Sequence, residues 1–406
     1  MTIQATVDGQ VVEWRDKKRY LWIMGAIIPL IPLMMWGLHA LTGGATVVWF
    51  FGPFFVFVLI PLFDLLAGLD PNNPPDELIE ALEEDRFYRW VTYAFIPVQI
   101  AGLIWGAYLL GGNTLPGIDD PLTVVQKIGL ALGLGMVAGI GINTAHELGH
   151  KKEEHERWFA RVALAQTFYG HFFIEHNRGH HVRVATPEDP ASGRLGETVW
   201  EFMPRTIIGS LKSAWSLEKK RFVRQKKSHW SIKNDLFNAW AFSLVLWGGL
   251  MIAFGWQILP YLLIQAAAGI WLLESVNYLE HYGMKRAKLD SGRYERVNPS
   301  HSWNSNNIGT NVLLYHLQRH SDHHANPTRR YQALRDFKEA PVLPTGYAGM
   351  IVLTWIPQVW RKVMDERVLS HYDGDIGRAN LHPRTADAYV RKYGAGTSQD
   401  EEVAAA

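Results

Sequence analysis

Four long stretches without a charged side chain limit what this sequence can fold into. Tyr20–Phe63 holds no Asp, Glu, Lys or Arg over 44 residues, with Thr42-Gly43-Gly44 near its middle. A helix rises about 1.5 Å per residue and a bilayer core is about 30 Å thick, so this stretch can cross a membrane twice. Trp90–Ile118 and Ile128–Ala145 each allow one crossing, and Leu236–Leu273 allows two. Buried helices of a large soluble protein are the other interpretation, but uncharged stretches of this length favour lipid.

We therefore expect an all-α, polytopic integral membrane protein with six transmembrane helices and a cytoplasmic, histidine-rich helical cap, forming a single domain over 1–406. Apolar spans alternate with polar segments along the chain. The apolar stretch 345–360 is short and contains proline, so we expect it to be packed or interfacial, and 401–406 to be a frayed tail. The expected spans are 20–41, 46–68, 90–110, 126–145, 236–254 and 258–279, and the expected cap segments are 70–89, 146–235 and 280–406.

Basic residues predict the orientation in the membrane. The short loops 42–46, 111–120 and 254–257 contain neither Lys nor Arg, whereas the long segments carry them. By the positive-inside rule, both termini and the cap face the cytoplasm. Formal net charge is only +1, which argues against a nucleic-acid partner. The exception is a basic stretch that fits either an acidic redox protein or anionic lipid headgroups: Lys219, Lys220, Arg221, Arg224, Lys226 and Lys227.

The histidines carry the strongest functional signal. There are 17 in 406 residues, and nine of them fall in four short motifs. The motifs are HELGH at 146–150, HNRGHH at 176–181, NYLEHYG at 277–283 and HSDHH at 320–324. Residues four apart share one face of a helix, so each triple can direct several imidazoles to one point. The candidate ligands are His146, His150, His176, His180, His181, His281, His320, His323 and His324.

Nine imidazoles exceed the coordination number of any single metal. Zinc takes four ligands and octahedral iron at most six, so two metals are the natural count. Imidazole suits iron, copper and zinc alike, and spacing alone does not choose among them. HELGH also matches the H-E-x-x-H motif of zinc proteases, in which Glu147 would be the general base. Such a protease needs one further ligand and not seven, which disfavours that alternative. A metal transporter or sensor is a third alternative.

The four motifs together resemble those of membrane di-iron oxygenases. HELGHKK, FIEHNRGHH, NYLEHYG and LQRHSDHH are similar to the motifs of the alkane 1-monooxygenase family and of its relative xylene monooxygenase, over a region from Lys17 to about Gly394. The resemblance implies terminal hydroxylation of medium- to long-chain n-alkanes with O₂ and two electrons. It implies two non-haem iron ions held by the nine histidines, and a bacterial inner-membrane location with the site on the cytoplasmic side.

The resemblance also implies rubredoxin as electron donor, reduced by rubredoxin reductase. The sequence has no cysteine, so it cannot itself hold a rubredoxin iron centre. The donor is then a separate chain or a fused domain outside this sequence. A related membrane desaturase or hydroxylase, acting on acyl chains or aromatic methyl groups, stays the alternative function.

Other residues are candidates for supporting the site or binding substrate. Carboxylates beside the motifs can orient ligand histidines through the second ring nitrogen. These are Glu147, Glu175, Asp189, Glu280 and Asp322, with Glu280 the first choice for a metal-bridging carboxylate. His171 and His316 are expected to have supporting or structural roles. An alkane has no polar handle, so an apolar channel must select it by shape. Candidate channel residues are Trp49, Phe54, Phe57, Leu62 and Gly139.

Overall fold

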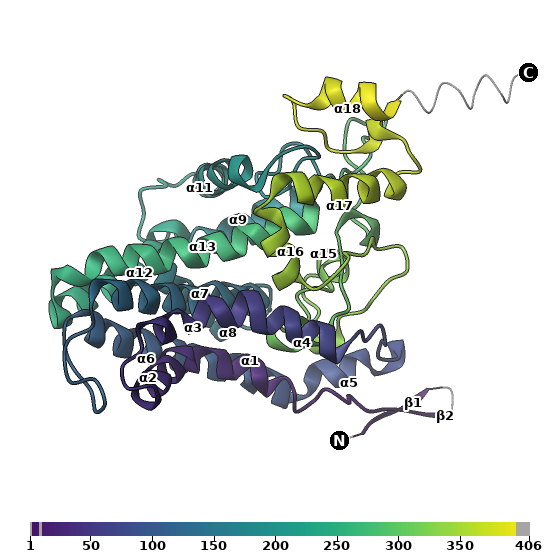
Figure 1. Cartoon of the computed structure of the whole chain (residues 1–406). Coiled ribbons are helices and arrows are strands. Elements are labelled where there is room, and N and C mark those ends of the chain that lie inside the picture. Colours follow the sequence, from purple (N-terminus) through teal and green to yellow (C-terminus); the bar gives the residue numbers. More distant parts are fainter. Residues whose placement is uncertain (1, 8–9, 395–406) are drawn as a thin grey trace, which may run out of the picture.

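A computed structural model describes residues 2–7 and 10–394 (Figure 1). It is mostly helical, and six of its helices are long and apolar enough to cross a membrane. The expected fold class and number of spans are therefore confirmed. The span ends differ from the predicted ones by a few residues, chiefly because two helices continue past their apolar stretches. The expected tail 401–406 lies outside the described residues.

The six spanning helices follow the apolar stretches closely. The first is built from α1 (Ile23–Ile27), a 3₁₀ turn (Ile28–Leu30) and α2 (Ile31–Leu41). The second joins a 3₁₀ turn (Thr46–Phe50), α3 (Phe51–Phe54), a π turn (Phe55–Leu59) and α4 (Ile60–Ala67). The others are regular: α6 (Arg86–Leu110), α7 (Val124–Gly149), α12 (Asp235–Phe254), and α13 (Leu259–His281), which follows a 3₁₀ turn at Trp256–Ile258.

Further helices, all but α11 shorter than the spans, form the cap at one end of the bundle (Figure 1). Between spans four and five lie α8 (Glu154–Leu164), α9 (Phe172–Glu175), a π turn (His176–His180), α10 (His181–Arg183) and α11 (Val199–Arg224). After span six come α14 (Ile308–Leu313), α15 (His320–Ala325), α16 (Tyr347–Thr354), α17 (Pro357–His371) and α18 (Ala386–Tyr393). The linker after span two contains α5 (Ile79–Glu84).

Helix α7 is the centre of the bundle and is buried along nearly its whole length. It begins with a capping box, in which the Thr123 hydroxyl accepts from the Gln126 backbone N–H and the Gln126 side chain accepts from the Thr123 N–H. Small residues along α7 let neighbouring backbones come very close. Gly52 of α3 is an example, because a Cβ there would lie 2.5 Å from the Gly133 Cα.

Two features of the fold add to the prediction. An antiparallel hairpin of β1 (Ile3–Val7) and β2 (Gln10–Trp14) precedes the first span and was not expected in an all-α chain. The stretch 345–360 is packed, as expected: α16 contacts α13, and Tyr347, Met350 and Trp360 are buried. This places α16 beside the ends of the spans that carry histidines.

The close approach of α3 to α7 predicts a sharp effect of one methyl group. We expect Gly52→Ala to lower the free energy of unfolding by about 1–3 kcal/mol, because the new Cβ overlaps backbone that cannot rotate away. Gly37→Ala on α2 is the control, since nothing lies within 4 Å of a Cβ there. Thermal unfolding in detergent compares them, and equal melting temperatures would contradict this packing.

Candidate metal centre

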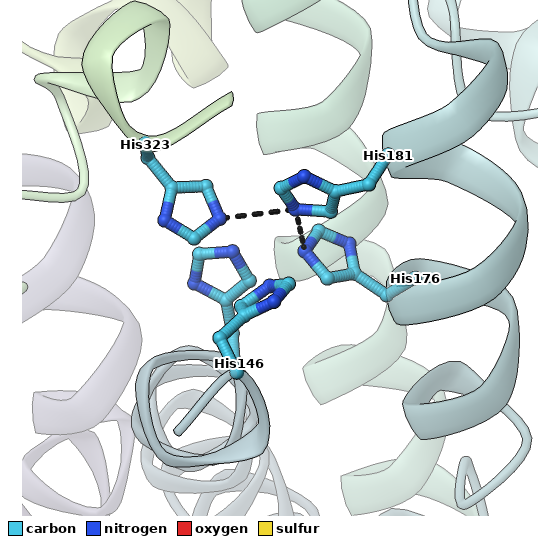
Figure 2. A group of neighbouring side chains, drawn as sticks. His146, His176, His181 and His323 are labelled. Carbon is cyan, nitrogen blue, oxygen red and sulfur yellow. Dashed lines mark hydrogen bonds between the residues drawn. The ribbon is translucent and has the colours of Figure 1, made fainter. Parts of the chain in front are cut away.

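The nine motif histidines come together in two neighbouring groups. In each group the members offer ring nitrogens that lie within 4.8 Å of one another and could hold a metal ion. Figure 2 shows four members of the first group pointing toward one another from α7, the π turn, α10 and α15. The five-histidine group is His146, His150, His176, His181 and His323, and the four-histidine group is His180, His281, His320 and His324.

The ends of the spanning helices supply part of each group. Helix α7 continues past its apolar stretch to Gly149, which places His146 and His150 one turn apart at its end. Helix α13 likewise continues to His281. The other six histidines come from the cap, so the site lies at the junction between bundle and cap.

A π turn divides the second motif between the two groups. The sequence spacing predicted that His176 and His180 share one face. Instead, the His181 N–H donates to the His176 carbonyl five residues back. In an α-helix residues five apart would be about 140° apart, whereas the wider turn brings them to one face. His176 and His181 therefore join the five-histidine group and His180 joins the other. Nothing in the residue pattern announces this turn.

The absence of a side chain at Gly179 leaves room for the Glu175 carboxylate beside the π turn. The Glu175 carboxylate lies over this glycine, and a Cβ at position 179 would overlap it. Glu175 accepts a hydrogen bond at 2.6 Å from Arg183, beyond the turn. The Glu175 carboxylate thus links the residue before the π turn to Arg183 after it, which stabilises the helix that carries three histidines.

The imidazole nitrogens converge at short distances. Nε2 of His181 lies 3.1 Å from Nε2 of both His176 and His323. In the other group, Nε2 of His320 lies 2.8 Å from that of His324 and 3.2 Å from that of His281. Nε2 of His146 and His150 is buried without a hydrogen-bond partner in the described structure. Converging lone pairs and orphaned buried nitrogens both fit a bound cation, so the donor set suits two imidazole-binding metals.

Burial keeps these imidazoles in the ligand form. Loss of water holds the pKa of His176, His181 and His323 well below the ordinary histidine value, and neighbouring histidines lower it further. The same holds for the pKa of His320 and His324. A lowered pKa leaves the ring neutral at pH 7, and neutral imidazole is the form that binds metal.

Three side chains contact histidines of the four-histidine group: Asp189 and Ser302 at Nδ1, and Glu280 at the converging Nε2 of His320. His180 Nδ1 lies 2.9 Å from Asp189, which also accepts from the Ser192 hydroxyl at 2.6 Å. Burial alone would raise the pKa of Asp189, but His180 and these hydrogen bonds lower it to about 2, so it is an ionised acceptor. Glu280 lies 3.2 Å from Nε2 of His320, and its other oxygen has no partner. Ser302 lies 3.4 Å from Nδ1 of His281.

Two other candidate carboxylates point elsewhere. Glu147 forms an ion pair at 2.9 Å with Lys151 and accepts from the Tyr331 N–H at 3.2 Å. Asp322 accepts at 2.7 Å from both Arg329 and Asn326, which secures the loop after α15. Glu147 is therefore not directed at the histidines as the general base of a zinc protease would be.

A narrow apolar cavity lies between the spans and α16. A second, smaller cavity shares Asn143 and Leu317 with it and reaches His146 and His323. Sequence reasoning did not single out Asn143, although it lies one turn before His146 and donates to the Leu314 carbonyl at 2.8 Å. The larger cavity is lined by Val56, Ile60, Gly139, Ile140, Asn143, Leu272, Leu273, Val276, Thr310, Leu314, Leu317, Tyr347, Ala348 and Ile351.

Of the five candidate channel residues, Gly139 lines this cavity. Trp49 is buried and donates its ring N–H to Nδ1 of His39 at 3.1 Å. Phe57 packs edge-on against Trp355. Phe54 and Leu62 are 48% and 47% exposed on the outside of the second span.

The two additional histidines lie outside both groups. His171 packs on Tyr169. His316 lies between Lys18 and the Tyr331 carbonyl, at 3.0 and 2.8 Å. Both are buried, and neither contributes a nitrogen to the converging sets.

Known proteins are similar in sequence to this chain over most of its length. Residues 122–354 match the fatty acid desaturase family. Alkane 1-monooxygenase 1 of Alcanivorax borkumensis is 44% identical over 393 residues, which cover 96% of this chain and 95% of the relative. Alkane 1-monooxygenase of Pseudomonas putida is 43% identical over 408 residues, covering 99% and 98%.

A more distant relative is named for its action on another class of hydrocarbon. The xylene/toluene monooxygenase hydroxylase component of Pseudomonas putida is 28% identical over 334 residues, covering 80% of this chain and 85% of the relative. These near full-length sequence identities agree with the histidine-rich membrane architecture described above. The chain therefore belongs to the alkane 1-monooxygenase family of oxidoreductases.

Proposed function

We propose that this protein hydroxylates the terminal carbon of medium- to long-chain n-alkanes to 1-alkanols, using O₂ at a di-iron site. The observation that carries the proposal is an apolar cavity beside nine converging imidazoles: a second, smaller cavity shares Asn143 and Leu317 with it and reaches His146 and His323. Five histidines would hold one iron and four the other, with His180 and His181 adjacent in the chain. The irons would supply the O₂ activation and electron transfer that no amino-acid side chain provides.

The residues of this chain would position the substrate and exclude water. The larger cavity is lined mostly by aliphatic side chains, which suits a molecule without hydrogen-bonding groups. Asn143 and Leu317 border both cavities and would admit only the narrow methyl end of a chain toward His146 and His323. Alkanes partition into the bilayer interior, so spanning helices can take them directly from lipid.

The electrons would come from rubredoxin, itself reduced by rubredoxin reductase. The sequence contains no cysteine with which to bind rubredoxin iron, so the donor is a separate chain or a domain outside this sequence. We assign the cap, the histidine groups and both termini to the cytoplasmic side of a bacterial inner membrane. The basic segments at Lys17–Arg19, Lys151–Lys152 and Lys285–Lys288 support that orientation.

Reconstituted turnover tests this function directly. Iron-loaded protein in lipid nanodiscs, with rubredoxin, its reductase and NADH, is expected to convert octane to 1-octanol. His281→Ala, which removes one nitrogen from the four-histidine group, is expected to abolish the product. Product analysis by gas chromatography distinguishes the alternatives. Turnover of an acyl thioester or of p-xylene, with no 1-octanol formed, would contradict the proposal.

Glu147→Gln separates hydroxylation from the proteolytic alternative. The Glu147 carboxylate pairs with Lys151, so the amide is expected to leave iron content unchanged and 1-octanol formation within about threefold of wild type. A zinc protease would lose about 10²–10⁴-fold with its general base. Metal analysis and turnover are measured on the same preparation, and a hydroxylation loss of that size with iron retained would overturn this role for Glu147.

Ala348→Leu tests whether the cavity determines which alkane chain length is preferred. The larger side chain fills part of the cavity wall, so the ratio of dodecane to octane turnover is expected to fall by about tenfold or more. Ala101→Leu, on the exposed side of α6, is the matched control and should leave the ratio unchanged. Competition assays with both alkanes give the ratio, and an unchanged value in Ala348→Leu would remove the cavity from the substrate path.

A further inference from the structure

Helix α11 has an apolar face that no described part of the chain covers. Its inner face is buried, and Thr206 on that face donates at 2.8 Å to Glu274 of α13. On the other side Trp200 and Ile208 are each 53% exposed, and Leu211 is 38% exposed. At about 100° of rotation per residue, these three and Trp215 lie within about 80° of one another. The helix is therefore amphipathic, with its apolar stripe turned outward.

The exposed stripe is continuous with the surface of the spanning helices. The Trp200 ring lies 4.9 Å from that of Trp271 on α13. At the other end, the Trp215 ring lies 6.0 Å from Phe237 in the first turn of α12. Trp230 and Ile232, just before α12 begins, are 70% and 88% exposed. The stripe thus joins two helices that cross the membrane, at the level where one of them enters it.

The same segment carries a dense set of unpaired cations. Glu218 is its one acidic residue between positions 202 and 234, and it is buried and paired with Arg178 and Arg221. Lys212 and Lys219 lie about 120° and 100° from Trp200 around the helix, at the border of the apolar stripe. Seven exposed cations form no ion pair with any described residue: Lys212, Lys219, Lys220, Arg224, Lys226, Lys227 and Lys233.

We propose that α11 and the following segment 225–234 lie on the membrane surface and bind anionic phospholipid headgroups. The apolar stripe would enter the boundary of the acyl chains, with the lysines against phosphate. Tryptophan and basic residues beside an apolar stripe are the composition of interfacial helices, and clusters of four to eight basic residues favour anionic lipid. The stripe adjoins Trp271 and Phe237 of two spanning helices, which favours lipid over a soluble protein as the occupant.

Two side chains of α11, Glu218 and Ser213, connect this helix to the helix that carries the second histidine motif. Arg178, within the π turn, pairs at 2.7 Å with Glu218. Arg183, just beyond the turn, donates at 2.7 Å to the Ser213 hydroxyl. Lipid bound on the outer face would therefore steady the helix that presents His176, His180 and His181. The inference concerns membrane contact and holds whether or not the protein hydroxylates alkanes.

Spin labels at single cysteines test the placement of α11. The chain has no native cysteine, so each substitution gives one labelled site. In vesicles, a nitroxide at Leu211→Cys is expected to be accessible to O₂ and shielded from a water-soluble nickel chelate. Lys220→Cys, about 180° from Leu211 on the same helix, is the matched control and should show the reverse. Equal exposure of both labels to the chelate, or shielding of Leu211→Cys only after a soluble protein is added, would overturn the proposal.

Lipid selectivity tests the charged part. Vesicles of phosphatidylglycerol and phosphatidylcholine that contain the protein are dissolved in detergent. The protein is then purified, and the lipid that it retains is measured by mass spectrometry. We expect enrichment of phosphatidylglycerol that falls by about fivefold in the test variant and stays unchanged in the control. The test variant is Lys219→Gln, Lys220→Gln, Lys226→Gln and Lys227→Gln, and the control of equal charge is Lys152→Gln, Lys288→Gln, Lys338→Gln and Lys362→Gln. Equal enrichment in both variants would contradict anionic-lipid binding.

Discussion

The mutual approach of nine imidazoles, seven of them buried and two half-buried, is the constraint on which the structure depends. Their nitrogens lie as close as 2.8 Å, with lone pairs directed toward common points. Leaving one such buried group without a partner costs about 1–3 kcal/mol. Two bound cations would convert that cost into a stabilising interaction. This requires that the ends of α7 and α13 lie at the same level as the π turn and α15, and that all four keep their orientation.

The membrane bundle gives this site its surroundings. Helices α7 and α13 pack closely and carry histidines at their ends, and the smaller cavity, which shares Asn143 and Leu317 with the cavity between the spans, reaches His146 and His323. The cap closes the other side through buried polar contacts, such as Asp189 with His180 and Glu175 with Arg183. Apolar side chains border the site on one side, and the polar contacts of the cap border it on the other. An apolar substrate and buried ligands can meet there without a polar binding group.

Sequence reasoning reached the spans and the histidines because both follow simple rules. Uncharged length predicts crossings, and the nine histidines are dense enough to stand out from chance. How they divide between two groups could not be predicted, because one π turn moves His181 to the face of His176. Contacts between distant segments were equally hidden. Glu147 pairs with its own helix neighbour, while Asn143, with no motif of its own, lies between the cavity and the imidazoles.

The metal content of the purified protein tests the central claim most directly. Protein expressed in iron-replete medium is purified in detergent and its metals are counted by mass spectrometry. Because the histidines form two converging groups, the account predicts about two irons per chain with little zinc. About one zinc per chain and no iron would contradict a di-iron site.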